Sequence, residues 1–195
     1  MKKQAAILAI LKQYITRDHK RLLEVGCGSG NDAVFLGKQF PALHWVTSDL
    51  KRNHKFIKER LKDHKLINVH GPEKLEVGKD DFPGRLMFDL VYTANTLHIM
   101  GWKTNKTFFK LLGKRLREGS LVFFYGPFNY NGEFSSDSNK ELDASLKKND
   151  PKSGIRSFED VETNMIKSGF NLLNDHEMPE DNRLLVFERL QFSKY

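Results

Sequence analysis

The sequence predicts an α/β fold with a doubly wound, seven-stranded, mostly parallel sheet that ends in an antiparallel strand pair. Apolar runs of strand length alternate with longer segments whose apolar residues recur at helical spacing. Glycines break the first apolar run and lead directly into a helical pattern. The last two runs are joined by the short link 178–183, which requires antiparallel strands because a parallel return needs about a dozen residues or more.

The glycine-containing stretch is the feature around which the chain is organised. Residues 22–25 are typical of a buried strand, Gly26, Gly28 and Gly30 follow, and a helical pattern begins at Ala33. A sharp turn through glycines brings backbone N–H groups close to a ligand. At the first strand-to-helix turn of an open α/β sheet, that ligand is a nucleotide or a nucleoside.

The remaining elements follow from periodicity and from the positions of turn residues. Helices are expected at 4–16, 33–40, 51–64, 105–117, from 138 onward and at 158–168. Strands are expected at 22–25, 43–48, 74–77, 88–94, 120–125, 171–177 and 184–192. Ser138 and Glu141 have the spacing of a capping box, which predicts a helix start at Ser138.

The composition is that of an ordinary globular domain, with 39% hydrophobic and 29% charged residues. A length of 195 residues predicts one domain, residues 1–195, whose first twenty residues contain the N-terminal helix. The single cysteine excludes an internal disulfide and fits a reducing compartment. Lys12 interrupts the apolar run 5–11, which argues against a signal peptide, and no run approaches the ~20 residues of a membrane helix. We therefore expect a cytoplasmic protein that is not a membrane protein.

Much of the net charge of +7 is concentrated in residues 51–65, where seven lysines and arginines oppose only Glu59 and Asp63. Phe56, Ile57 and Leu61 lie on one side of this predicted helix, so most of the basic residues are expected on a solvated face. A surface that meets an anionic substrate or RNA is the alternative.

Two carboxylates accompany the glycines. Glu24 lies in the strand two residues before Gly26, where a carboxylate can meet an ammonium group, and Asp49 closes the next strand, where it can accept both ribose hydroxyls. The glycines alternate strictly, whereas nicotinamide-binding domains use Gly-x-Gly-x-x-Gly. Together with the terminal antiparallel pair, this pattern resembles the class I S-adenosylmethionine (SAM) methyltransferases from residue 22 to the end. The resemblance implies SAM as the cofactor rather than a nicotinamide.

Further motifs resemble one family within this class. The motifs are Ala94-Asn95-Thr96-Leu97-His98-Ile99, Tyr125-Gly126-Pro127-Phe128-Asn129, Ser138-Asn139, Asp150-Pro151 with Gly154-Ile155-Arg156, and Met178-Pro179 followed by Asn182. They span nearly the whole chain and are similar to a bacterial and eukaryotic family of methyltransferase-like proteins catalogued as a domain of unknown function. The resemblance implies the fold and the cofactor but no particular methyl acceptor.

The resemblance also assigns residues to the cofactor. Glu24 would lie near the methionine amino group, Asp49 would bind the ribose, and Glu76 would meet the adenine amine. The full set expected to hold the cofactor is Glu24, Gly26, Gly28, Gly30, Asp49, Glu76 and Asn95. Structural alternatives stay open, because Asp49 can instead cap the basic helix and Glu24 can be a buried, satisfied carboxylate.

His98 is the candidate general base, because it follows the 88–94 strand at the edge where open α/β sheets bind ligands and because imidazole titrates near neutrality. Aromatic and polar residues near the same edge could form an acceptor site; they are Trp102, Tyr125, Phe128, Asn129, Arg156 and Asn182. For each of them a packing or capping role is the alternative. The seven histidines are dispersed without metal-ligand spacing, so no metal site is expected.

These observations predict SAM-dependent methyl transfer to a small molecule. The Asn-Pro-Pro-Tyr type motif of amino-methylating nucleic-acid enzymes is missing after the 88–94 strand, which argues against adenine or cytosine amino groups as acceptors. Residues 126–168, a polar loop followed by helices, are expected to form a substrate lid. A non-catalytic or RNA-directed SAM-binding protein that uses the basic helix 51–65 is the main alternative, and a NAD-dependent oxidoreductase is a weaker one.

Overall fold

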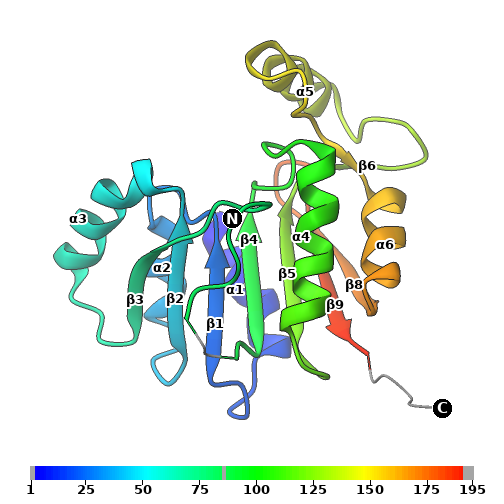
Figure 1. Cartoon of the computed structure of the whole chain (residues 1–195). Coiled ribbons are helices and arrows are strands. Elements are labelled where there is room, and N and C mark those ends of the chain that lie inside the picture. Colours follow the sequence, from blue (N-terminus) through cyan, green and yellow to red (C-terminus); the bar gives the residue numbers. More distant parts are fainter. Residues whose placement is uncertain (1–2, 85–86, 191–195) are drawn as a thin grey trace.

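Seven strands form one sheet in the order β3-β2-β1-β4-β5-β9-β8 within residues 3–84 and 87–190, which are the residues that this computed structural model describes (Figure 1). The strands are β1 (Arg21–Val25), β2 (His44–Asp49), β3 (Val69–Lys74), β4 (Leu90–Ala94), β5 (Leu121–Gly126), β8 (Phe170–Met178) and β9 (Asn182–Arg189). β1 to β5 are parallel, and β9 runs antiparallel between β5 and β8. The predicted mostly parallel sheet with an antiparallel terminal pair is confirmed.

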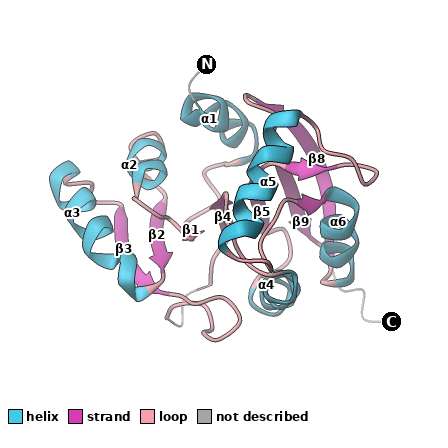
Figure 2. Ribbon diagram, turned by 90° about the horizontal axis from the view of Figure 1, so that it is seen from above, coloured by secondary structure: helices cyan, strands magenta, loops and turns pink. Residues whose placement is uncertain are grey.

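Helices cover both faces of this sheet. They are α1 (Lys3–Tyr14), α2 (Asn31–Gly37), α3 (His54–His64, after the 3-10 turn Lys51–Asn53), α4 (Trp102–Arg115), α5 (Asp137–Asn149) and α6 (Phe158–Lys167). Seen from above, α1, α2 and α3 lie on one face, and α4 and α6 lie on the other (Figure 2). α5 lies above the edge at which the parallel strands end (Figure 1). The short strands β6 (Phe128–Asn129) and β7 (Arg156–Ser157) pair with each other and tie the two ends of the α5 segment together.

The alternation of side chains along each strand divides the core into two layers. On β1, Leu22 packs in the layer under α1 and α2, and Leu23 packs in the layer under α4 and α6. The same alternation on β5 sends Phe123 and Phe124 to opposite faces, and all four side chains are fully buried. Because both faces of the strands are covered, the polar side chains of Glu24 on β1 and Thr93 on β4 are buried as well.

The third strand is not where the sequence analysis predicts it. It spans Val69–Lys74 rather than residues 74–77, and it forms the edge of the sheet next to β2. Its register with β2 shifts between Val46 and Ser48, and the Thr47 hydroxyl donates a 2.9 Å hydrogen bond to the carbonyl of His70. An edge strand needs few buried side chains and tolerates a proline, so the segment has no apolar alternation to reveal it.

Several helix starts also differ from the predictions; α2, for example, begins at Asn31 instead of residue 33. The N-cap of α5 is Ser136, whose hydroxyl accepts a 3.2 Å hydrogen bond from the backbone N–H of Asn139, so the capping-box spacing at Ser138 is misleading. α4 begins at Trp102 instead of residue 105 and ends at Arg115. The last predicted strand, 184–192, is observed as Asn182–Arg189, and its predicted residues 191 and 192 lie outside the described residues.

Candidate functional site

The carboxyl ends of β1, β4 and β5 bring the predicted site residues to one edge of the sheet. The glycine loop follows β1, Asn95 follows β4, and Gly126 ends β5. The backbone N–H of Asn95 donates a 2.8 Å hydrogen bond to the carbonyl of Tyr125, which fixes the end of β4 against β5. This is the edge at which open α/β sheets bind ligands.

The glycine loop is held by backbone hydrogen bonds. The N–H groups of Gly26 and Cys27 donate to the carbonyl of Ser48 over 3.0 and 3.1 Å, and the N–H of Gly30 donates to Cys27 over 2.8 Å. Gly26 has a φ of +70°, and a Cβ atom there would lie 2.6 Å from the hydroxyl oxygen of Thr96. Glycine is therefore required at this position for both its φ and its contact with the end of β4.

Asp49 fixes the glycine loop to the end of β2. Its Oδ2 accepts a 2.7 Å hydrogen bond from the N–H of Gly28, and its Oδ1 accepts bonds of 2.7 Å from the N–H of Leu50 and from Nδ2 of Asn53. A carboxylate offers roughly four acceptor positions, so one is left for a ligand hydroxyl. The alternative role as a helix cap is partly present, since Leu50 immediately precedes the 3-10 turn before α3 and Asn53 ends that turn.

Glu24 lies beneath the glycine loop and is 2% exposed. Among the described residues only the indole N–H of Trp45 donates to its carboxylate, over 2.7 Å to Oε2. Burial, together with the negative charge of Asp32, raises the pKa of Glu24 to about 8, although the Trp45 hydrogen bond opposes the shift. A cation that binds beside such a buried carboxyl group stabilises its ionised form.

Asp32 is a member of the site that the sequence analysis does not include. Its Oδ2 accepts hydrogen bonds from the Tyr92 hydroxyl, over 2.9 Å, and from the ammonium of Lys3, over 3.0 Å. Its Oδ1 accepts a 3.1 Å bond from the side-chain amide of Gln4. Asp32 stands two residues after the last glycine of the loop, and this proximity is the one sequence signal that could have found it.

A cavity of about 300 Å³ opens between the glycine loop and the first turn of α1. Ligand pockets commonly have volumes of about 300–1,000 Å³, so this cavity is at the lower end of that range. Its lining residues are Lys3, Gln4, Glu24, Gly26, Cys27, Gly28, Ser29, Asn31, Asp32 and Ala94. The cavity is thus lined both by the predicted Glu24, Gly26 and Gly28 and by Asp32 with its hydrogen-bond partners Lys3 and Gln4.

Glu76 does not line this cavity. It lies on the loop after β3, and its carboxylate forms a 2.6 Å ion pair with Lys79. Its backbone N–H donates a 2.8 Å hydrogen bond to Asp80. The predicted contact of Glu76 with an adenine amine stays a prediction, and the Lys79 pair would have to open for it.

His98, Asn95 and Gly126 lie together at the ends of β4 and β5. A Cβ atom on Gly126 would lie 3.3 Å from Oδ1 of Asn95 and 3.5 Å from Nδ1 of His98. His98 is 7% exposed, and burial together with the positive charge of Arg156 lowers its pKa to about 4. The imidazole is therefore neutral at neutral pH, which is the state that a general base requires.

The predicted acceptor residues are spread over several environments. Phe128 is 2% exposed within the core layer under α4 and α6, and Trp102 packs against that layer with its ring edge-on to Phe109. Tyr125 is buried in the other layer, with the ammonium of Lys3 5.1 Å from the centre of its ring. The three rings do not form one aromatic wall, and a direct contact of any of them with an acceptor stays a prediction.

The predicted polar residues contact backbone groups. Arg156 donates to the carbonyls of Leu97 and Lys152, over 3.1 and 2.9 Å, and to that of Met100. Asn182 donates to the carbonyls of Pro179 and Glu180 in the turn before β9. Side-chain Oδ1 of Asn129 is buried with no hydrogen-bond partner among the described residues.

Arg156 and its neighbours connect the α5 segment to the loop that carries His98. The N–H of Gly154 donates a 2.8 Å hydrogen bond to the carbonyl of His98 itself. At its other end, α5 is tied to the β8–β9 turn by a 3.0 Å bond from Nδ2 of Asn139 to the carbonyl of Asp181. The segment predicted to be a lid is thus bonded on two sides of the candidate site.

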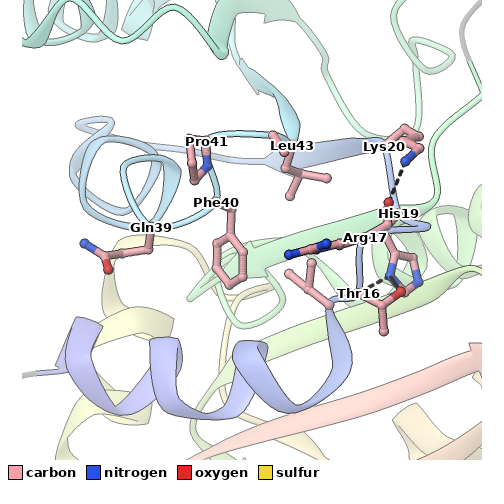
Figure 3. A pocket seen from close by; sticks show the side chains of 10 residues that line it. Thr16, Arg17, His19, Lys20, Gln39, Phe40, Pro41 and Leu43 are labelled. Atoms are coloured by element: carbon pink, nitrogen blue, oxygen red, sulfur yellow. Dashed lines mark hydrogen bonds between the residues drawn. The ribbon is translucent and has the colours of Figure 1, made fainter.

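A larger cavity of about 510 Å³ lies at the opposite edge of the sheet. Figure 3 shows that side chains from the segments leading into β1 and β2 surround it, Arg17 and Phe40 among them. None of the predicted site residues lines it. It lies at the amino ends of the strands, so the fold favours the smaller cavity as the functional site.

The described residues contain no group of three or more histidine, cysteine, aspartate or glutamate side chains that could hold a metal ion. Among the same residues, no helix has the length and apolar character needed to cross a bilayer.

The strand order, the glycine turn after β1 and the antiparallel β9 are the fold of the class I methyltransferases. Three solved structures share it: the S-adenosylmethionine-dependent methyltransferase SibL in its apo form, PigF with SAH, and human N-acetylserotonin methyltransferase in complex with SAM. Their TM-scores are 0.79, 0.82 and 0.78, at 20%, 16% and 12% sequence identity. The matches cover 96%, 96% and 97% of this chain but 55%, 56% and 52% of those chains, so this chain spans about half their length.

The chain belongs to the family described as "Protein of unknown function (DUF938)", whose model matches residues 1–189. The methyltransferase-like family resemblance found in the sequence is thereby confirmed, as is the fold that it implies.

Proposed function

We propose that this chain binds SAM in the cavity between the glycine loop and α1 and transfers its methyl group to a small-molecule acceptor. The observation that supports this most directly is Glu24, a carboxyl buried beside three alternating glycines and bonded by one donor only among the described residues. An ammonium group in the cavity would supply a second partner. The solved structures with SAM or SAH and the same fold support the choice of cofactor.

The residues that border the cavity have the hydrogen-bonding groups and the open space that SAM requires. Glu24 would accept from the methionine ammonium, and the remaining acceptor position of Asp49 would take a ribose hydroxyl. A Cβ atom on Gly28 would meet no other described atom within 4 Å, so this backbone borders open space that a ligand can approach. Asn95 and Glu76 are the further predicted contacts.

When bound, SAM supplies a methyl group on a sulfonium that is already activated for transfer. The chain's residues then have to align the acceptor, exclude water and accept any proton that the acceptor loses. His98 is buried and neutral, and an unprotonated nitrogen of its ring would accept that proton. The α5 segment would cover the acceptor, since it lies above this edge and is bonded to the loop that carries His98.

A small molecule is the acceptor class that we favour, because His98 is 7% exposed and its carbonyl is bonded to Gly154, which follows α5. One protein that shares this fold is by name a methyltransferase of N-acetylserotonin, which is a small molecule. We propose the same broad class of acceptor for this chain.

The proposal is tested by titration calorimetry with SAM, SAH and NAD, followed by transfer of labelled methyl groups from SAM to separate small-molecule, RNA and protein fractions of a cell extract. Binding of SAM and SAH together with label in the small-molecule fraction is the expected result. A preference for NAD would overturn the cofactor assignment, and label confined to RNA or protein would overturn the acceptor class.

An RNA-directed role is the second candidate, and one observation favours it. Five lysines on and beside α3 recur at intervals of four, three, four and three residues and are all exposed; they are Lys51, Lys55, Lys58, Lys62 and Lys65. None of these described lysines takes part in an ion pair. RNA binding whose affinity falls steeply with salt, and which is lost when these lysines are replaced by glutamine, would support this role.

A further inference from the structure

The first turn of α1 forms one wall of the candidate cofactor cavity. Lys3 and Gln4 line it from one side, and Glu24 lines it from beneath the glycine loop. Figure 1 shows the start of α1 at the same upper edge of the sheet as the glycine turn after β1. A positively charged side chain and a carboxyl group therefore border the same small volume.

Lys3 is held in place by groups that do not use up its donors. Its ammonium carries three N–H donors, and among the described residues only Asp32 accepts from it, over 3.0 Å. The ring of Tyr125 lies 5.1 Å away and adds a cation–π contact. The side chain is 36% exposed, so the ammonium is positioned but still open to a ligand.

Gln4 is also held by Asp32 through only part of its donor capacity. Its side-chain amide has two N–H donors and gives one of them to Oδ1 of Asp32, over 3.1 Å. Asp32 is itself 8% exposed and receives a third bond from the Tyr92 hydroxyl, over 2.9 Å. Asp32 is thus a positioning residue, which orients Lys3 and Gln4 toward the cavity while their remaining donors stay free.

The two walls are therefore complementary in their hydrogen-bonding capacity. Lys3 and Gln4 offer donors and a positive charge, whereas Glu24 offers acceptors, with only Trp45 bonded to it among the described residues. A ligand group that fits both walls must carry a negatively charged acceptor and a positively charged donor a short distance apart. The α-carboxylate and α-ammonium of an amino acid meet this requirement.

We propose that Lys3, with Gln4 beside it, is the binding subsite for the α-carboxylate of the amino-acid end of SAM, and that Asp32 positions it. This inference rests on the proposed function, because it assigns a contact within the same cofactor cavity. It adds that the N-terminal helix is part of the cofactor site and selects a zwitterionic amino-acid group over a simple amine.

The test compares ligands that differ by one group at a time. SAM carries both the carboxylate and the ammonium, decarboxylated SAM lacks only the carboxylate, and methylthioadenosine lacks the whole amino-acid end. Affinities are measured by titration calorimetry for the wild type, for Lys3→Met, and for Lys12→Met as the control. Lys12 is an exposed lysine on the same helix, and its replacement makes the same change of charge away from the cavity.

Lys3→Met is expected to weaken SAM roughly 10- to 100-fold, the effect of losing a charged hydrogen bond, and to leave decarboxylated SAM and methylthioadenosine unchanged. Lys12→Met should leave all three affinities unchanged. Glu24→Gln should weaken both SAM and decarboxylated SAM, since both carry the ammonium, and spare methylthioadenosine.

Two outcomes separate this inference from the proposed function. If the wild type binds none of the three ligands, both the proposed function and the carboxylate subsite are wrong. If the wild type binds SAM but Lys3→Met binds it equally well, or loses SAM and decarboxylated SAM to the same extent, the carboxylate subsite alone is wrong. Should Lys3→Met lose methylthioadenosine as well, Lys3→Arg, which keeps the charge, must restore the preference for SAM over decarboxylated SAM, and its failure to do so overturns the inference.

Discussion

The backbone N–H of Gly28 donates a 2.7 Å hydrogen bond to the carboxylate of Asp49. This bond joins the glycine loop after β1 to the end of β2, so one side chain both shapes the loop and borders the predicted ribose position. Loss of that carboxylate should therefore affect the cofactor site in two ways, by freeing the loop and by removing an acceptor.

Asp49→Ala is expected to weaken SAM binding by roughly 10- to 100-fold, because a charged hydrogen-bond partner of the ribose is lost. Titration calorimetry measures the change. Asp63→Ala, which removes an exposed carboxylate from α3, serves as the control and should bind SAM as the wild type does. Unchanged affinity in Asp49→Ala would show that the ribose assignment is wrong.

The raised pKa of Glu24 leads us to expect that the protein releases protons when the cofactor binds. With its pKa raised to about 8 by burial and by Asp32, its carboxyl is largely protonated at neutral pH in the free protein. An ammonium bound beside it favours the carboxylate, so up to one proton should leave when SAM binds near pH 7. Calorimetry in buffers of different ionisation enthalpy counts that proton. Glu24→Gln should release none, and equal release by this variant and the wild type would assign the proton to another group.

The same carboxyl makes the free energy of unfolding depend on pH. Its pKa is higher in the folded protein than in the unfolded chain, so its contribution is fully present below the ordinary value of 4.5 and is lost as the pH rises toward about 8. Within this window the wild type should lose about 1.4 kcal/mol per pH unit relative to Glu24→Gln. Urea unfolding of both proteins at several pH values between these limits tests the slope. Parallel curves would contradict the raised pKa.

The lowered pKa of His98 predicts how the rate of methyl transfer depends on pH. Burial and Arg156 lower its pKa to about 4, so the imidazole can accept a proton throughout the neutral range and loses this ability as the pH falls through about 4. We expect kcat at saturating SAM to be flat above that value and to decrease below it. His98→Ala should lower kcat by about 100-fold or more and keep the affinity for SAM.

His64→Ala, an exposed histidine at the end of α3, is the matched control for His98 and should keep the wild-type rate. If His98→Ala turns over as fast as the wild type, His98 is a structural residue of the loop after β4. If it loses SAM binding as well, its role is in forming the cofactor site instead of in proton transfer.

Sequence periodicity was sufficient to locate a strand where helices cover both faces of that strand. β1, β4 and β5 are rich in apolar residues because successive side chains pack in the two core layers, and the glycine turn follows from residues adjacent in the chain. β3 lies at the edge and includes Gly71 and Pro72, so it has no such run. The error at β3 is therefore a consequence of where the strand lies in the sheet, which local sequence does not specify.

The residues of the candidate cofactor site show a similar division. Glu24, the glycines and Asp49 are within about one strand–helix–strand unit and could be found from spacing. The partners of Asp32 could not, because Lys3 and Tyr92 are 29 and 60 residues away from it along the chain. Only the packing of α1 on one face of the sheet, with its first turn beside the glycine loop, brings Lys3 to Asp32. For the aromatic residues, sequence does not show the packing: Phe128 lies in the core and Trp102 packs against it, and their contact with an acceptor stays a prediction.

The glycine loop provides a prediction that separates folding from binding. Gly26 and Gly28 both have positive φ, +70° and +58°, so alanine costs roughly 1–2 kcal/mol of backbone energy at either position. At Gly26 the added Cβ would also lie 2.6 Å from the Thr96 hydroxyl, whereas at Gly28 no described atom lies within 4 Å of it. Overpacking of this kind costs about 1–3 kcal/mol more.

Gly26→Ala should therefore be the less stable of the two variants in urea unfolding, and the additional substitution Thr96→Ala should restore part of the loss by removing the contact. Gly28→Ala should retain most of the wild-type stability and yet bind SAM more weakly, because its methyl group would enter the open space beside the cavity. Titration calorimetry on the folded variants measures that second effect. Equal stability of the two variants would contradict the close packing of Gly26 against Thr96, and wild-type affinity in Gly28→Ala would show that the cofactor does not approach the loop at this point.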